Sequence, residues 1–182
     1  MAVIRSVALL RAINVGGHTV RMDRLRTLFE ELALPRVETF IASGNVLFDA
    51  PSAKHASLET RIERQLAQAL GYEVITFIRP LAELARVAND HPFDTDAADG
   101  HALSIGFLKA PLDAEHAARV AALSNDYDRF HMSDRQLYWH CRGRMSDSTL
   151  FGKVLDRAIG SPVTFRNVTT IRKLAAKASA LP

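Results

Sequence analysis

The sequence predicts an α+β protein in which residues 1–79 fold as a β-α-β-β-α-β unit. Three observations support this prediction. Short segments rich in β-branched and apolar residues alternate with longer segments whose apolar residues recur at helical spacing. Glycine, proline and asparagine stand at the joints between them, where turns and helix ends are expected. A β-α-β-β-α order then recurs in the second half, with no detectable repetition of the residues themselves.

The first half contains four predicted strands and two predicted helices. Val3 to Leu10 is β-branched and apolar, which is typical of a buried strand. Leucines recur at helical spacing between Met22 and Ala33, which predicts an amphipathic helix that Pro35 ends. Gly71 is the predicted C-cap of the second helix. The predicted strands cover 3–10, 37–41, 46–48 and 73–78, and the predicted helices cover 22–33 and 53–70. This order is the split βαβ unit of ferredoxin-like folds.

The second half is predicted to be a second α+β subdomain. Its predicted strands cover 102–109, 127–132 and 136–141, and its predicted helices cover 81–87, 113–123, 149–159 and 168–178. No linker separates the halves, so subdomains 1–79 and 80–182 are expected to pack closely or to form one domain. Element order alone favours a structural duplication.

Composition and cysteine usage favour a cytoplasmic globular protein. The chain has 182 residues, of which 48% are hydrophobic and 24% charged, and these values allow a full hydrophobic core. Its one cysteine, Cys141, forms no internal disulfide, which fits a reducing compartment. The apolar run near the N-terminus is too short for a signal peptide, and no stretch reaches the ~18 apolar residues that a membrane span needs. We therefore expect no membrane association.

Charge is unevenly distributed along the chain. The formal net charge is +3, but residues 1–36 and 142–182 are basic, whereas residues 37–141 are acidic. Basic ends are suited to an anionic ligand or to nucleic acid. The alternative is that the basic ends pack near the acidic middle.

The loop from Arg11 to His18 is the first candidate site. Gly16 and Gly17 permit positive φ and close approach of the backbone to a ligand. A helix follows directly, and its N-terminus offers unpaired N–H groups and partial positive charge. Arg11, His18, Arg21 and Arg24 are the basic residues around this loop. Such a loop can hold a phosphate or a carboxylate. The alternative is a Gly-Gly turn with solvated basic neighbours.

Two other segments carry polar residues at turns or helix starts. Ser43, Gly44 and Asn45 are residues that a hairpin turn favours. Arg166 and Asn167 precede the last predicted helix, and either Asn167 or Thr164 is suited to cap it. Capping alone accounts for Asn167 unless this segment meets the first loop in space.

Several common activities lack their sequence signatures. The chain has neither the G-x-G-x-x-G spacing of a dinucleotide loop nor the Gly-Lys-Ser/Thr end of a P-loop. Ala42-Ser43-Gly44 lacks the first glycine of a nucleophile elbow. No metal-binding spacing is present, and we expect no metal. Cys141 is expected in the core rather than as a nucleophile, and no RNP-like run of aromatic and basic residues occurs.

These residues resemble the domain-of-unknown-function family 1697. The resemblance lies in Leu9-Leu-Arg-Ala-Ile-Asn-Val-Gly-Gly17, Met22-x-x-Leu25 and Thr39-Phe-Ile-Ala-Ser-Gly-Asn-Val46. It continues in His91-Pro-Phe93, Leu137-Tyr138 and Thr164-Phe-Arg-Asn-Val-Thr-Thr170, so that it covers nearly the whole chain. It implies a bacterial-type cytosolic protein with a ferredoxin-like first part and a second α+β part, and it brings no established activity.

The chain departs from the family pattern at two positions. Ala12 stands where the family usually has glycine, which suggests that this position needs no positive φ. Val168 stands where the family usually has tryptophan, which argues against an aromatic stacking role there.

The leading hypothesis is an anion-recognising protein for a nucleotide or another phosphorylated small molecule. Charge would come from Arg11 and Arg166, backbone donors from Gly16 and Gly17, orienting groups from Asn14, Ser43 and Asn45, and a helix start from Asn167. If the protein is an enzyme, His18 is the candidate acid or base. The alternatives are nucleic-acid binding through the basic ends and a structural or interaction module without catalysis. The sequence assigns no cofactor and no oligomeric state.

Overall fold

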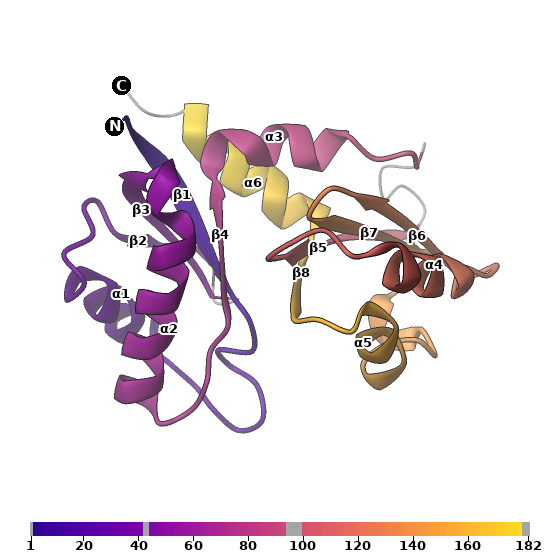
Figure 1. Cartoon of the computed structure of the whole chain (residues 1–182), viewed down its shortest axis with the longest axis horizontal. Helices are drawn as coiled ribbons and strands as arrows, with labels where there is room; N and C mark the ends of the chain where they lie inside the picture. The colour runs from indigo at the N-terminus through magenta and orange to yellow at the C-terminus, as the bar shows by residue number, and fades with distance from the viewer. Residues whose placement is uncertain (1, 42–43, 94–99, 180–182) are drawn as a thin grey trace. The chain divides into compact units, whose positions relative to one another are not determined.

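A computed structural model of the chain describes residues 2–41, 44–93 and 100–179. The chain divides into two compact units, unit 1 (residues 1–85 with 174–182) and unit 2 (residues 86–173). Each unit contains one four-stranded antiparallel sheet with helices, which confirms the α+β class (Figure 1). The predicted subdomain boundary between residues 79 and 80 stays a prediction, since compactness alone does not define a domain.

Unit 1 has the predicted β-α-β-β-α-β order. Its strands are β1 (Val3–Leu10), β2 (Glu38–Thr39), β3 (Asn45–Pro51) and β4 (Thr76–Pro80), and its helices are α1 (Met22–Glu30), η1 (Ser52–Lys54) and α2 (His55–Leu70). The sheet order is β2-β3-β1-β4 with every pair antiparallel. Gly71 ends α2 in the left-handed conformation, which confirms the predicted C-cap. The helix α3 (Leu81–Asn89) follows β4, and the boundary between the units falls within it.

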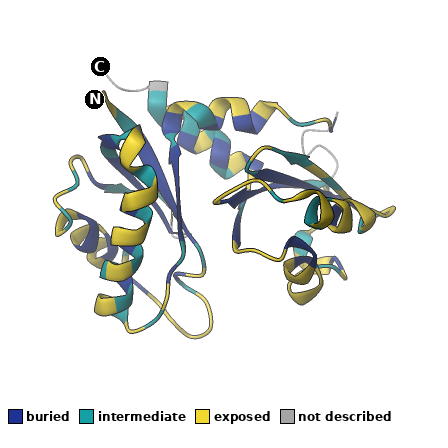
Figure 2. Cartoon of the chain, in the orientation of Figure 1, coloured by how far each residue is buried: buried dark blue, intermediate teal, exposed yellow. Residues whose placement is uncertain are grey.

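Both faces of the first sheet are buried. One face packs against the apolar stripes of α1 and α2, through residues such as Leu25, Leu28, Leu58 and Ile62. Val7, Leu9, Leu47 and Phe77, on the other face, are fully buried as well. Most of β1, β3 and β4 is accordingly dark blue in Figure 2, whereas the outer faces of α1 and α2 are exposed. Near β2, the Lys177 amine bonds to the Glu38 carboxylate and lies 5.0 Å from the centre of the Phe40 ring.

Unit 2 repeats the order of unit 1. Its strands are β5 (Ala102–Leu108), β6 (Asp128–Ser133), β7 (Gln136–Cys141) and β8 (Val163–Asn167), and its helices are α4 (Ala114–Ala122), η3 (Met145–Asp147) and α5 (Lys153–Ile159). The sheet order β6-β7-β5-β8 matches that of the first sheet strand for strand. The helix α6 (Val168–Ser179) follows β8, as α3 follows β4. The ferredoxin-like arrangement therefore occurs twice.

The core of unit 2 contains one buried carboxylate. Leucine and aromatic side chains such as Leu137 and Trp139 form this core with apolar residues of α4 and α5. Asp128 is 1% exposed; its Oδ1 accepts from Trp139 Nε1 at 2.7 Å and its Oδ2 from Ser148 Oγ at 2.7 Å. Cys141 donates to the same carboxylate, and burial raises the pKa of this thiol to about 12. The prediction that Cys141 belongs to the core is confirmed.

The strand β8 was missing from the prediction. Thr164 was expected as an alternative helix cap, but it lies in β8 opposite Phe107 and is 4% exposed. Val163, Thr164 and Phe165 have the β-branched and aromatic character of a strand. Because Arg166 and Asn167 are polar and precede a helix, the sequence favours a helix start at this segment rather than a strand. Two other boundaries also shift, because β2 has only two residues and α5 begins at Lys153, after Gly152 at φ +85°.

Strand pairing makes the two units comparable residue by residue. In β4, Arg79 lies opposite Val7 of β1, and in β8, Arg166 lies opposite Ile105 of β5. Both arginines are nearly or fully buried, and each donates from Nη1 to the carbonyl of the residue before it. By the same pairing Asn45 and Gln136 are equivalent, and both are buried. The duplication therefore extends from element order to the placement of buried polar side chains.

None of the helices in the described part of the chain has both the length and the apolar content needed to cross a bilayer.

Candidate functional site

The loop between β1 and α1 is fixed at three points. The amide of Arg11 donates to the carbonyl of Ile75 at 2.8 Å, and the Tyr72 hydroxyl donates to the carbonyl of Ile13 at 2.8 Å. Within the loop, the amide of Val20 donates to Asn14 Oδ1 at 2.7 Å. Asn14 therefore has a structural role in closing the loop. Its expected contact with a ligand stays a prediction.

Gly16 and Gly17 form the exposed tip of this loop. Both have positive φ, +68° and +88°, and His18 N donates to Val15 O at 3.3 Å across the turn. Consecutive positive φ values favour glycine at both positions. No atom lies within 4 Å of the place where either glycine would carry a Cβ. Among the described residues, the Gly16 and Gly17 amides donate no hydrogen bond to the protein. Two neighbouring amides of an exposed turn are thus without a hydrogen-bond partner in the described part of the chain.

His18 stands beside these amides on an aromatic support. Its ring stacks on Tyr72 with centroids 3.9 Å apart and planes at 21°. Tyr72 follows Gly71 directly, so the C-cap of α2 places this ring under the loop. Burial raises the pKa of the Tyr72 hydroxyl, which keeps it neutral and able to donate to Ile13. His18 is exposed at the surface of unit 1.

The carboxylate of Asp23 occupies the N-terminus of α1. Asp23 Oδ1 accepts from the amide of Arg24 at 2.8 Å, and its carboxylate pairs with Arg21 at 2.8 Å. The bond from the Arg24 amide, with a smaller contribution from Arg21, lowers the pKa of Asp23. Arg24 itself pairs with Glu31 at 3.6 Å. Side chains of the protein thus already occupy the charged and polar groups at the start of α1.

The hairpin between β2 and β3 lies next to this loop. Asn45 is fully buried and donates from Nδ2 to Phe40 O at 3.0 Å. Gly44 has φ +76°, and a Cβ there would lie 2.6 Å from Ile13 Cγ2. Only glycine fits this close approach to the loop. Ser43 falls outside the described residues. For Ser43 and Asn45 alike, ligand contact stays a prediction.

Ala12 corrects one expectation from the sequence. The departure from glycine suggested that position 12 needs no positive φ, but Ala12 has φ +59°. An alanine tolerates the left-handed region at a cost of ~1–2 kcal/mol. The loop between Arg11 N and Tyr72 holds this conformation despite the cost, and the loop proper begins at residue 11.

Arg166 and Asn167 belong to unit 2. Asn167 Oδ1 accepts from the amide of Thr169 at 2.8 Å, which confirms Asn167 as the cap of α6. Arg166 Nη1 donates to Thr164 Oγ1 and Phe165 O, each at 2.9 Å. Burial lowers the pKa of the Arg166 guanidinium to about 10, so it stays protonated at neutral pH. That Arg166 and Asn167 join the Arg11 loop in one site stays a prediction.

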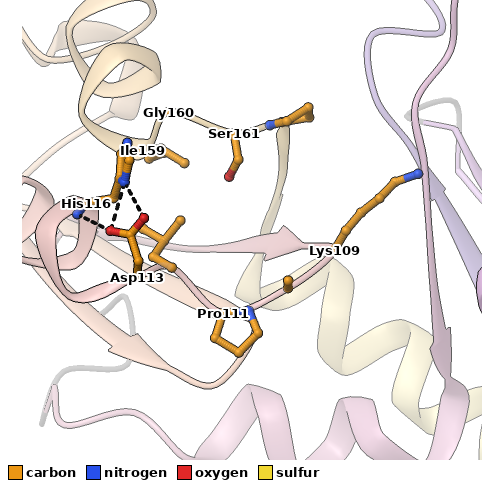
Figure 3. A pocket seen from close by; sticks show the side chains of 10 residues that line it. Lys109, Pro111, Asp113, His116, Ile159, Gly160 and Ser161 are labelled. Carbon is orange, nitrogen blue, oxygen red and sulfur yellow. Dashed lines mark hydrogen bonds and ion pairs between the residues drawn. The ribbon is translucent and has the colours of Figure 1, made fainter.

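Unit 2 contains a cavity that the sequence did not indicate. It measures about 260 Å³ and is lined by the β5–α4 loop, Lys109 to Asp113, and by the α5–β8 loop, Gly160 to Pro162 (Figure 3). Asp113 caps α4: its Oδ1 accepts from the His116 amide at 2.8 Å, and its carboxylate pairs with His116 Nδ1 at 2.9 Å. In the sequence, the only feature related to this cavity is Asp113 at a helix start with His116 three residues later. The two loops that line the cavity lie far apart in the sequence, so the sequence does not bring them together.

The family model for DUF1697, described as a protein of unknown function, matches residues 3–138. The chain belongs to the DUF1697 family. This match covers unit 1 from Val3 to Ala85, the strands β5 and β6 and the first half of β7.

A solved structure resembles the whole chain. It is the conserved bacterial protein SP0830 from Streptococcus pneumoniae, at 24% identity and a TM-score of 0.74, with 97% of this chain and 99% of that chain covered. At this identity the likeness shows the fold. No curated protein matches the chain. The function of this DUF1697 member must therefore be argued from its own residues.

A histidine cluster lies on the second sheet, apart from the cavity. His101 Nδ1 lies 3.2 Å from His140 Nε2, and the His140 ring stacks on Phe93 at 5.3 Å. Burial, followed by His101, lowers the pKa of His140. Within residues 2–41, 44–93 and 100–179, no group of three or more His, Cys, Asp or Glu side chains is arranged to hold a metal ion.

Proposed function

We propose that this protein binds a phosphate-bearing, nucleotide-like anion at the Arg11–His18 loop of unit 1. The observation that carries the proposal is the exposed Gly16-Gly17 turn, whose two amides make no hydrogen bond among the described residues. Neighbouring backbone amides of this kind bind phosphate and carboxylate oxygens.

Two side chains favour a nucleotide over a simple anion. Arg11 is half-buried at the base of the loop and brings positive charge to it. The exposed face of His18, supported by Tyr72, offers a surface on which a nucleobase can stack. A nucleotide carries both groups that this arrangement would bind, an anionic phosphate at the amides and a planar base on His18.

Calorimetry with inorganic phosphate, AMP, ATP and adenosine tests this proposal. We expect the nucleotides to bind more tightly than phosphate, and adenosine to bind weakest because it lacks an anion. Arg11→Ala should weaken nucleotide binding by about tenfold, the loss of one charge-assisted contact. Arg26→Ala is the matched control, because Arg26 is an exposed arginine of α1 that pairs with Glu30. Absence of binding by every anion, with all variants folded, would rule the proposal out.

Variants of the aromatic pair separate stacking from charge. His18→Ala should lower the affinity for ATP more than that for inorganic phosphate, because only the nucleotide carries a base. Tyr72→Phe keeps the ring but removes the hydroxyl that donates to Ile13, so it should act through the position of the loop. Equal losses for ATP and phosphate in His18→Ala would contradict the stacking role. If turnover accompanies binding, His18 is also the candidate acid or base.

The roles of Ser43, Asn45, Arg166 and Asn167 in this site are part of the proposal. Asn45→Ala and Asn167→Ala are expected to lose stability, since Asn45 holds the hairpin and Asn167 caps α6. If no anion binds and only stability changes, these residues serve turns and caps, and the protein is a structural or interaction module. We place this activity in the cytoplasm, where a single buried cysteine is common.

Nucleic-acid binding is a second candidate, favoured by an exposed aromatic residue in the basic C-terminal segment. Phe151 is 59% exposed, and Arg142, Arg144 and Lys153 near it in the sequence are exposed too. An aromatic ring among basic side chains suits single-stranded nucleic acid. Affinity for an oligonucleotide should then fall steeply with salt, and Phe151→Ala should reduce it. Affinity independent of salt would remove this candidate.

A further inference from the structure

The cavity of unit 2 occupies the same place in its unit as the proposed anion site does in unit 1. Leu10 ends β1 opposite Thr76, and Leu108 ends β5 opposite Val163. In each unit the next residue is basic, Arg11 or Lys109, and a loop leads on to a helix. Gly71 and Gly160 end the helix before the fourth strand, both in the left-handed conformation. The duplicated fold thus places two loop pairs at equivalent edges.

The unit 2 cavity has a carboxylate in its wall, in contrast to the backbone donors proposed for unit 1. The Asp113 carboxylate is 65% exposed, and the hydrogen bond from the His116 amide is the main cause that lowers the pKa of Asp113 and keeps it ionised. The His116 ring bonds to the same carboxylate through Nδ1, at 2.9 Å from each oxygen. The helix α5 also ends at this cavity, and its last carbonyls carry partial negative charge.

The remaining walls are mostly apolar. Pro111, Leu112, Ile159 and Pro162 line the cavity. In Figure 3, Ser161 directs its hydroxyl into the space between the two loops, whereas the Lys109 side chain extends away from Asp113 and His116. The cavity is therefore small, and most of its wall is apolar. Its polar part contains the Asp113 carboxylate, the Ser161 hydroxyl and the end of α5.

Gly160 keeps the imidazole within this arrangement. A Cβ at Gly160 would lie 2.4 Å from His116 Nε2, so only glycine permits the ring to sit against the end of α5. Capping of α4 explains the bond from the His116 amide to Asp113. It does not explain why the imidazole of His116 bonds to the same carboxylate beside a cavity.

We propose that this cavity binds a small protonated amine with a short apolar body. The ammonium group would pair with Asp113 and donate to a neighbouring acceptor, while the alkyl chain would contact Ile159 and the prolines. A volume of about 260 Å³ suits a ligand of a few carbon atoms rather than a nucleotide. This site is separate from the proposed anion site, so the failure of either leaves the other standing.

Backbone NMR titration of the full chain with n-butylamine at neutral pH tests the proposal, with n-butyrate and 1-butanol as matched probes. Butylamine should shift the amide signals of residues 109–116 and 159–161, and the two controls should not. Asp113→Asn keeps the helix cap but removes the charge, and it should weaken butylamine binding by about fivefold, as expected for an exposed ion pair. Glu115→Gln, in the same turn of α4, should leave the affinity unchanged.

Three results would overturn the proposal. They are equal binding of butyrate or butanol, an Asp113→Asn variant with unchanged affinity for butylamine, and equal weakening by Glu115→Gln. The last result would show that butylamine responds to surface charge in general rather than to the cavity.

Discussion

The two units share a topology but differ in what stands at the edge where the first strand ends. Unit 1 presents donors there, the amides of Gly16 and Gly17 beside Arg11. Unit 2 presents the Asp113 carboxylate, to which the His116 ring bonds through Nδ1. The sheets behind them match strand for strand, with buried arginines at equivalent positions. The comparison shows that the strands of the two units correspond closely while the loops at this edge differ in their polar groups.

The largest difference in stability between equivalent substitutions in the two units is expected at the turns that precede β3 and β7. Gly44→Ala places a Cβ 2.6 Å from Ile13 Cγ2 at φ +76° and should destabilise the protein by ~2–4 kcal/mol. Arg135 is its equivalent, since Leu10 N donates to Gly44 O as Leu108 N donates to Arg135 O. Arg135→Ala should therefore change stability by less than ~0.5 kcal/mol. Urea denaturation measures both; equal losses would show that the two turns are not the distinct structures described here.

The alanines that follow the two basic residues should respond in opposite directions to the same substitution. Ala12 has φ +59°, whereas Ala110 is not among the described residues with positive φ. Ala12→Gly should raise the free energy of unfolding by ~1 kcal/mol, and Ala110→Gly should lower it by up to ~1 kcal/mol. Thermal unfolding of the two variants measures this contrast. A loss of stability in Ala12→Gly would mean that the loop does not strain the backbone at this residue.

Lowering the pH should reduce the stability of unit 2 gradually, and by less than the substitutions above. His140 and Asp49 occupy equivalent strand positions, and burial lowers the pKa of His140 below its ordinary value of 6.5. The same direction is reinforced by the charges of His101, Arg129, Arg142 and His91. Because the unfolded chain takes up this proton first, stability should fall as the pH drops below 6.5 toward the folded-state pKa.

The variant His140→Gln isolates this contribution. It should flatten the fall in urea midpoint below pH 6.5, because glutamine does not titrate. His18→Gln is the matched control, since the exposed ring of His18 lies in unit 1. If the two variants show the same pH profile as the unmodified chain, burial of His140 does not control the acid response.

Local signals in the sequence predicted much of the fold. The first strand is mostly β-branched or apolar, β7 matches its predicted limits at Gln136 and Cys141, and Gly71 ends α2 as its residue type indicated. The strand β8 was missed because its five residues end in Arg166 and Asn167, which also fit a helix start. Its place in the sheet comes from pairing with β5, and a single segment carries no information about its partner.

The candidate sites were predictable to different degrees. Gly16 and Gly17 are adjacent in the sequence, so the turn that they form could be anticipated. The stack of His18 on Tyr72 joins two segments that only the fold brings together, and so does the cavity between Asp113 and Gly160. The conformation of Ala12 was misjudged because residue type indicates preference, whereas the bonds of the surrounding loop determine φ.

One residue-resolved NMR titration tests whether the two units bind ligands of opposite charge at equivalent edges. ATP should shift the amide signals of residues 15–19, with the largest changes at Gly16 and Gly17, and leave residues 109–116 unchanged. Butylamine should do the reverse. If ATP leaves Gly16 and Gly17 unmoved, or if both ligands shift the same loop, the loops do not divide donor from acceptor chemistry and the account is wrong.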